Sequence, residues 1–406
     1  MNALAERYVR LALAMGQHDA DYVDAYYGPA EWKPTGEKRP LADLDREAAA
    51  LDRELSRLVP GTGQEEMVRL RHRYLVRQLA SVRTRIAMLS GTRLTFDQES
   101  EALYDAVAPI QAQSDFAETL KALDARLPGT GPLVGRYNRF RDRYTIPKDR
   151  VDATFRAAID GCKARTVAHV SLPAGESFTV EYVTGKSWSG YNWYQGGYRS
   201  LIQVNTDLPI LVDRAVDLAC HEGYPGHHVY NVLLEQHLVR ERGWVEYSVY
   251  PLFSPQSLIA EGTANYGIDV AFPLPERLDF ERRVVFPAAG LDPAGVEDYY
   301  GVMALVEKLS YAGNEAARQY LDGQIDAKGA VDLLVTWGLY SRPRAEQRIR
   351  FVDQYRSYVI NYNLGKDLVA AHVVALAGGD DQARRWQAFE GLLSSPRLPS
   401  GLSPSR

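Results

Sequence analysis

The spacing of apolar residues constrains the fold of this chain most strongly, because it follows the period of an α-helix along most of the sequence. In the segment 41–58, five leucines lie three, seven, four and three residues apart, which places them on one helix face. Similar patterns recur at 65–89, 96–107, 115–127, 149–170, 209–223, 227–240, 255–270, 295–321, 327–337, 344–363 and 366–377. We therefore predict a mainly α protein.

One segment, residues 176–209, interrupts the helical patterns. It is rich in glycine, serine, threonine and aromatic residues, and its residues 178–183 alternate as a half-buried strand does. Residues 200–206 are a second strand candidate, and the glycines between the two supply turns. These features predict a small β-sheet, the only convincing β region in the sequence.

We expect residues 1–406 to form a single large, mostly helical domain, because no long linker separates two independent parts. Within it, residues 1–170 are the N-terminal helical part and residues 171–210 are the small β-sheet insertion. Residues 211–393 form a second helical part, and the Pro- and Ser-rich tail 394–406 is expected to be loose.

Charge and cysteine content narrow the partners and the compartment. The chain has 47 Lys+Arg and 52 Asp+Glu, a net charge of −5, which argues against nucleic acid as a principal partner. Its two cysteines, Cys162 and Cys220, cannot make a disulfide framework, so we expect buried thiols in a reducing compartment. Charged residues interrupt the apolar N-terminus, and no uncharged apolar run approaches the roughly 20 residues that cross a bilayer. We predict a cytoplasmic protein without a membrane partner.

Histidines cluster at one place in the second helical part. Three of the eight histidines, His221, His227 and His228, fall within eight residues, where an even spread would put roughly 0.16 of a histidine. The zincin motif His-Glu-x-x-His places two imidazoles four residues apart on one helix face, with the glutamate as general base. Here Pro225 occupies the fourth position after His221, so the strict motif is absent.

An unbroken helix cannot bring these histidines to one metal ion. His227 would be turned by about 240° from His221 and displaced by roughly 9 Å, and His228 would lie roughly 10.5 Å along the axis. Bonds between zinc and nitrogen are only about 2.0–2.1 Å long. However, Pro225 breaks the helix, and Gly226 can adopt the positive φ that turns the chain back. The sequence thus predicts an expanded turn that brings His227 to the place of the usual second histidine.

Glu261 is the candidate for the third ligand. It stands in an apolar helical segment, where an unpaired carboxylate is costly unless a metal or an arginine such as Arg356 compensates it. We predict that His221, His227 and Glu261 hold Zn²⁺ with one position left open for water. Glu222 would then accept the proton of that water while the zinc polarises a carbonyl.

These residues resemble a family of bacterial proteins of undefined function. The family pattern is His-Glu-x-x-Pro-Gly-His-His and later Glu-Gly-Trp-Ala-x-Tyr; this chain has His-Glu-Gly-Tyr-Pro-Gly-His-His at 221–228 and Ala-Glu-Gly-Thr-Ala-Asn-Tyr at 260–266. The Gly-His pair is also similar to carboxypeptidase Taq type zincins, whose His-Glu-x-Gly-His lacks the two-residue insertion. The resemblance implies a mostly helical, zincin-like body with a small sheet beside the cleft. It favours His227 over His228 as second ligand and Glu261 as third.

Two departures from the family concern the substrate pocket. Thr263 stands where the family has tryptophan, and residues 355–365 have a wider spacing than the family's Ser-Tyr-x-x-Gly region. In that region Tyr358 is our candidate hydrogen-bond donor to an oxyanion, although core packing is the ordinary role of tyrosines at helical spacing. His228 either supports the metal ligands or replaces His227.

Two more features bear on substrate binding. The aromatic run 188–198 either lines a substrate groove or covers the core, and residues 201–205 can pair with an extended peptide if they form an open edge. Together these features predict a zinc-dependent hydrolase of peptide or related amide bonds. A binding protein without catalysis and a hydrolase of non-peptide amides or esters are the alternatives. The sequence does not distinguish a peptide from another small-molecule substrate, and it does not indicate the oligomeric state.

Overall fold

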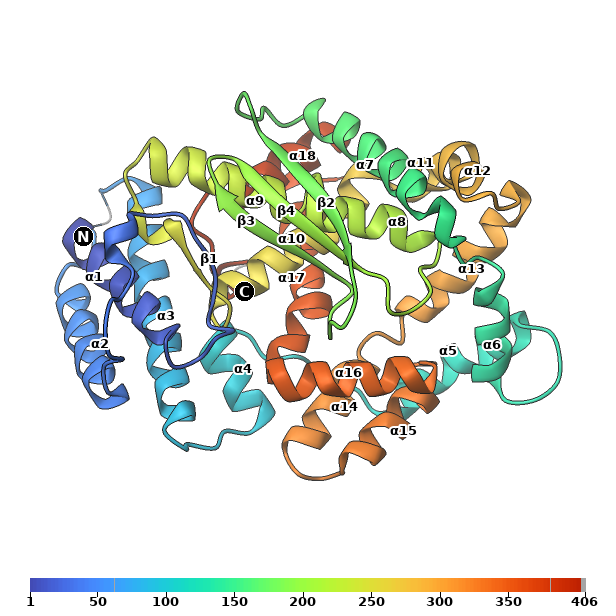
Figure 1. Cartoon of the computed structure of the whole chain (residues 1–406), viewed down its shortest axis with the longest axis horizontal. Helices are drawn as coiled ribbons and strands as arrows, with labels where there is room; N and C mark the ends of the chain where they lie inside the picture. The colour runs from blue at the N-terminus through green and yellow to red at the C-terminus, as the bar shows by residue number, and fades with distance from the viewer. Residues whose placement is uncertain (62, 380, 403–406) are drawn as a thin grey trace.

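The computed structural model describes residues 1–61, 63–379 and 381–402, and it confirms the predicted mainly α fold. The helices are α1 (Asn2–Met15), α2 (Leu41–Ser56), α3 (Glu66–Leu89), α4 (Phe96–Tyr104), α5 (Gln113–Arg126), α6 (Leu133–Asp142), α7 (Val151–Val167), α8 (Asp213–Leu218), α9 (His227–Leu234), α10 (Pro255–Ala271), α11 (Leu274–Phe280), α12 (Phe286–Ala289), α13 (Val296–Glu307), α14 (Ala312–Leu321), α15 (Ala327–Trp337), α16 (Arg342–Tyr355), α17 (Ile360–Ala377) and α18 (Gln382–Leu393). The N-terminal helices α1–α3 lie on one side, the larger sheet lies over the centre, and α14–α16 form the lower edge in Figure 1.

Two predicted helices are each divided in the structure. The pattern 295–321 forms α13 and α14, which are separated by a short turn. The pattern 344–363 ends as α16 at Tyr355, because Arg356 adopts a left-handed φ of 54°, and α17 begins at Ile360. The helices α1, α6, α11, α12 and α18 were not predicted from the sequence.

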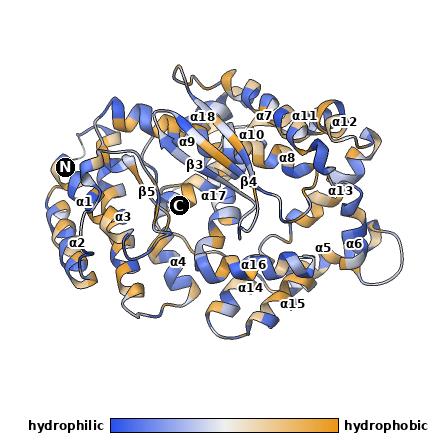
Figure 2. Ribbon diagram, viewed as in Figure 1, coloured by the Kyte–Doolittle hydropathy of each residue, from blue (hydrophilic) through white to orange (hydrophobic). Residues whose placement is uncertain are grey.

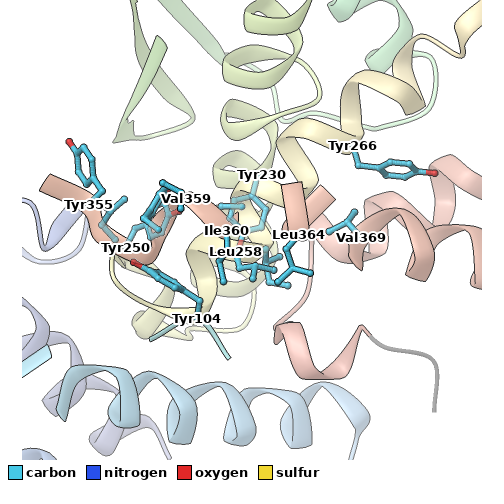
Figure 3. Close-up of a cluster of buried hydrophobic side chains, with 14 of the residues drawn as sticks. Tyr104, Tyr230, Tyr250, Leu258, Tyr266, Tyr355, Val359, Ile360, Leu364 and Val369 are labelled. Carbon is cyan, nitrogen blue, oxygen red and sulfur yellow. The ribbon is translucent and has the colours of Figure 1, made fainter. Parts of the chain in front are cut away.

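Helices α10 and α17 form the centre of the core. They approach closely at two glycines: a Cβ on Gly262 would lie 2.5 Å from the carbonyl oxygen of Gly365, so larger residues would separate the helices. Figure 3 shows Leu258 of α10 gathered with Ile360 and Leu364 of α17 around this crossing. Most helices carry both hydrophilic and hydrophobic residues, in the alternation expected of amphipathic helices around one core (Figure 2). This packing holds α10 rigidly beside α9.

The predicted sheet is present and has three strands. They are β2 (Ser177–Val183), β3 (Gly190–Gly196) and β4 (Arg199–Asn205), in the order β2-β4-β3. β4 pairs with β2 in parallel and with β3 antiparallel, so it is the central strand. Residues 201–205 therefore do not form the open edge that pairing with an extended peptide requires, because β2 and β3, the latter formed by the aromatic run, pair with β4 on its two sides.

A second, two-stranded sheet contradicts the prediction of a single β region. Its strands β1 (Val23–Tyr26) and β5 (Val249–Pro251) pair antiparallel. Both strands are short, and they come from segments more than 200 residues apart. Because such a pair has little local pattern, its formation depends on tertiary contacts.

Cys162 of α7 and Cys220 form a disulfide, so the expectation of free buried thiols is wrong. The bond also removes the argument from cysteine content for a reducing compartment. Among the described residues no helix combines the length and the apolar composition that a membrane crossing requires. The tail is packed as far as Leu402, which is buried against the core, contrary to the expected loose tail; residues 403–406 of that prediction lie outside the described part of the chain.

Candidate metal centre

The chain leaves helical geometry between His221 and His227, as the Pro-Gly insertion predicts. Helix α8 continues into a π-helical turn, Ala219–Gly223, and α9 begins at His227 after a three-residue loop. The loop folds the second imidazole back onto the first, so that Nε2 of His227 lies 3.1 Å from Nε2 of His221. The insertion therefore brings the two imidazoles together, as a four-residue spacing does on an unbroken helix.

The expected role of Gly226 is wrong in its detail. Its φ is −77°, which residues other than glycine also adopt. Glycine is needed because of close approach: a Cβ at this position would lie 1.9 Å from the carbonyl oxygen of His221. The amide of Gly226 also donates to the carbonyl oxygen of Cys220, at 2.9 Å. The turn is compact rather than left-handed.

Glu261 extends from α10 to the two imidazoles. Its Oε2 lies 3.3 Å from Nε2 of His221 and 3.7 Å from Nε2 of His227. One ligand atom from each of the three residues thus lies within 4.8 Å of the others, which is a grouping that can hold a metal ion. Arg356 does not compensate Glu261, because it pairs with Glu99 at 2.6 Å.

The chemistry of the group fits a divalent metal. Oε2 of Glu261 is buried and has no hydrogen-bond partner among the described residues. Burial acts to raise the pKa of Glu261, but the adjacent His221 and His227 outweigh burial and hold this pKa well below its ordinary value. A carboxylate that stays ionised beside two imidazoles is a donor set typical of zinc.

Two further side chains orient these donors. Nδ1 of His221 lies 3.1 Å from Oδ1 of Asn265, so with Nδ1 as the donor its Nε2 presents a lone pair to the group. The hydroxyl of Tyr358 donates to Oε1 of Glu261 at 2.8 Å, which leaves Oε2 to face the imidazoles. Tyr358 therefore lies behind Glu261 and holds its carboxylate. Sequence analysis did not find Asn265, although it lies four residues after Glu261 on the same helix.

Glu222 lies on the other side of His221. Its Oε1 is 4.0 Å from Nε2 of His221, and its Oε2 is buried without a hydrogen-bond partner among the described residues. Burial raises the pKa of Glu222, and the nearby histidines oppose that shift. Gly190 of β3 covers this carboxylate so closely that a Cβ there would lie 2.7 Å from Oε1. The sheet thus determines where the carboxylate of Glu222 can point.

His228 lies outside the group of three. Its Nδ1 is 2.9 Å from Oγ of Ser200, and its Nε2 is 2.9 Å from Oε2 of Glu176. Glu176 also accepts hydrogen bonds from Lys163 at 2.8 Å and from Tyr224 at 2.7 Å. Of the two alternatives for His228, the structure favours a supporting role, because His228 anchors the start of α9 to the sheet.

The group opens into a cavity of about 1250 Å³ whose walls include α8, α10, α16 and β3. The aromatic run serves both suggested roles: Trp188 and Tyr191 line the cavity, whereas Tyr194 is buried against Glu235. Asp24 of β1 also lines it, accepts a hydrogen bond from Tyr191, and has a pKa that burial raises to about 6. Asp24 had no signal in the sequence, because strand pairing across the chain places it there.

Tyr362 is a second tyrosine at the cavity. It lines the wall beside Tyr358, and its hydroxyl forms no hydrogen bond with a described residue. Its pKa is raised, first by burial and then by the negative charge of Glu261. A free phenolic hydroxyl close to the donor group is available for a ligand, whereas the hydroxyl of Tyr358 is already engaged.

Comparisons with known proteins support the fold. A lipoprotein candidate from Colwellia psychrerythraea matches with a TM-score of 0.54 and 14% identity over 92% of this chain and 69% of that one. A lipoprotein candidate of unknown function from Shewanella oneidensis matches with a TM-score of 0.50 and 14% identity, over 89% and 72% of the chains. An M32 carboxypeptidase from Deinococcus radiodurans R1 gives a TM-score of 0.35 and 14% identity, over 96% and 88%. No protein-family model and no curated protein matches the sequence.

Proposed function

We propose that this protein is a zinc-dependent hydrolase of amide bonds, with peptides as the first substrates to test. One observation carries the proposal: two imidazoles and a buried carboxylate oxygen, whose contacts among the described residues are with those imidazoles, converge on one point, with a second carboxylate beside them. The point lies on the wall of a cavity large enough for several residues of a peptide. The class is that of a zincin with an expanded turn, as the resemblance to the bacterial His-Glu-x-x-Pro-Gly-His-His family also implies.

His221, His227 and Glu261 would hold the metal. When bound, zinc acts as a Lewis acid on a carbonyl and lowers the pKa of water. Glu222 is placed to accept a proton at its carboxylate, because that side chain adjoins the donor group without taking part in it. The same carboxyl can return the proton to the leaving amine. Burial keeps Glu222 away from competing solvent protons.

Tyr362 is the better candidate for hydrogen bonding to an oxyanion. The hydroxyl of Tyr358 donates a hydrogen bond to Glu261, so it can donate to the substrate only if that hydrogen bond breaks. Tyr362 lines the cavity with a hydroxyl that has no described partner. Replacing Tyr362 with phenylalanine should therefore lower kcat, whereas Tyr358→Phe should act first on the affinity for metal.

The compartment is part of the proposal. A disulfide such as Cys162–Cys220 is typical of oxidising compartments, whereas free thiols are typical of the cytoplasm. Counting free thiols in protein prepared from its own cells under alkylating conditions would decide between the two. Two free thiols would support the cytoplasm, and none would support an oxidising compartment.

The proposal is tested by metal analysis and a hydrolysis assay on the same samples. We expect about one zinc per chain and cleavage of some members of a peptide library. Glu222→Gln should retain the metal and lower kcat by about 100- to 10,000-fold. Full activity of this variant would exclude Glu222 as the base. Zinc binding with no cleavage of peptides, acyl-amino acids or esters would support a binding protein instead.

A further inference from the structure

A group of arginines lines the cavity away from the metal centre. Arg141 comes from the end of α6, Arg214 from the start of α8, and Arg344 and Arg348 from α16. All three helices contribute to the wall of the same cavity, although they come from segments far apart in the sequence. In Figure 1, α6 lies at the right, α8 above it and α16 at the lower edge. We call these four residues the arginine group.

Three members of the arginine group have no anionic partner among the described residues. Arg141 contacts only the ring of Tyr137, at 5.1 Å, and Arg348 lies over the rings of Phe351 and Tyr362 at 4.9 and 5.4 Å. Arg344 donates one hydrogen bond, to a backbone carbonyl at 3.1 Å. The Nε atoms of Arg141 and Arg348 are buried and lack any hydrogen-bond partner. The side chains of Arg141, Arg344 and Arg348 are half-buried and line the cavity, so an anion in the cavity can pair with their guanidinium groups.

The nearby carboxylates do not supply that partner. Asp213 accepts a hydrogen bond from Tyr299 at 2.6 Å and forms no ion pair with the arginine group among the described residues; burial raises its pKa, whereas the charges of Arg214 and Arg141 act to lower it. Asp217 is shared between Arg277 at 3.0 Å and Arg214 at 3.4 Å. Burial, and then the like charges of Arg141 and Arg214, lower the pKa of Arg344. The arginine group therefore repels itself and leaves an excess of positive charge facing the cavity.

The arginine group and the metal centre are close enough for one substrate to contact both. Arg214 and His221 lie seven residues apart on the continuous helical segment formed by α8 and its π-helical turn. Seven residues of helix rise by roughly 10 Å along the axis, which sets the scale of the separation between these two residues. An extended peptide spans that distance with about three residues. Arg348 lies over the ring of Tyr362, which lines the same cavity.

We propose that the arginine group is a subsite for a doubly charged anionic group of the substrate, one to three residues from the bond that is cleaved. The chemistry is that of two oxyanion charges within reach of several guanidinium groups, as in a terminal residue with an α-carboxylate and a side-chain carboxylate, or in a phosphorylated residue. A single terminal carboxylate would leave part of the positive charge unpaired. The inference rests on the proposed hydrolytic site, whose substrate class it names.

The test compares three peptides that differ only in the last residue, on the C-terminal side of the expected cleavage: glutamate, glutamine and phosphoserine, each with a free terminal carboxylate. On the zinc-loaded protein, glutamate or phosphoserine should raise kcat/KM about 10- to 100-fold over glutamine, chiefly through KM. The double variant Arg141→Gln/Arg344→Gln should lose this preference and still cleave the glutamine peptide. Whichever acidic peptide is preferred identifies the source of the charge.

Matched variants separate charge from folding. Arg350→Gln, exposed on α16 and absent from the cavity wall, should keep the preference, and Arg344→Lys should keep part of it. Equal rates for the three peptides, or a preference that survives in the double variant, would overturn the inference while leaving the hydrolase intact. If no peptide is cleaved, the hydrolase proposal fails. Calorimetric binding of the glutamate and glutamine peptides to the wild type and the double variant then decides the subsite alone.

Discussion

Two neighbouring clusters around α9 contain the same kinds of side chain and differ in how completely they are paired. In the network around His228, each ring nitrogen has a partner, and Glu176 accepts three hydrogen bonds. In the centre around His227, the nitrogens face each other and Oε2 of Glu261 has no hydrogen-bond partner among the described residues. Histidines one residue apart therefore differ in role. The candidate site differs from the structural network because one of its donor and acceptor atoms has no hydrogen-bond partner among the described residues.

The largest expected effect separates the two histidines directly. His227→Ala should lower zinc affinity by more than about 100-fold and abolish hydrolysis, because it removes one of three donors. His228→Ala should retain zinc and lose stability instead, because it leaves Glu176 and Ser200 without their partner. Zinc content after dialysis and thermal melting of both variants check this. If His228→Ala lost the metal and His227→Ala kept it, the assignment of the second ligand would be reversed.

A methyl group added at Gly190 of the sheet should displace the carboxylate of Glu222, the proposed base, and leave the metal ligands in place. In Gly190→Ala the added Cβ would displace Oε1 of Glu222, so we expect kcat to fall about 10- to 100-fold at unchanged zinc content. Gly391→Ala on α18, where a Cβ meets nothing within 4 Å, is the matched control. Unchanged kcat in Gly190→Ala would show that the position of Glu222 is not critical.

Tyr358→Phe tests the support behind the donor group. The variant loses the hydrogen bond to Oε1 of Glu261, and the loss of such a supporting contact weakens metal affinity by about 10- to 100-fold. At saturating zinc, activity should largely return. A competition assay with a chelator measures the affinity. Persistent loss of kcat at saturating zinc would instead give Tyr358 the oxyanion role expected from the sequence.

The smallest effect concerns the paired network. The hydrogen bonds from His228, Lys163 and Tyr224 outweigh burial and lower the pKa of Glu176 from 4.5 to about 2. Its ionised form therefore stabilises the folded protein above pH 4.5, and this contribution is lost as the pH falls toward 2. Glu176→Gln should lower the free energy of unfolding by about 1–2 kcal/mol at pH 7. In urea unfolding the difference from wild type should shrink below pH 4; a constant difference would contradict this account.

The predictions from the sequence were confirmed for features that depend on the local residue pattern. The helical periodicity, the strands β2 and β4, and the break between His221 and His227 all follow from residues close together in the chain. The role of Gly226 was wrong, because the contact that requires glycine there is with a backbone oxygen five residues earlier. The pairing of β1 with β5 and the central place of β4 depend on contacts that no local pattern encodes.

The sequence by itself determined the mainly α fold class, and it named His221, His227 and Glu261 as candidate donors with His228 as the alternative to His227. It did so because helix periodicity is local, and because Pro225 and Gly226 interrupt the helix wherever it lies. Only the tertiary structure decided which polar groups are paired. His228 is paired with Glu176, Oε2 of Glu261 lies among the imidazoles, and three of the four members of the arginine group have no ion pair with a described carboxylate. Pairing depends on which distant segments pack together, so the charge distribution along the cavity wall became visible only in the folded chain.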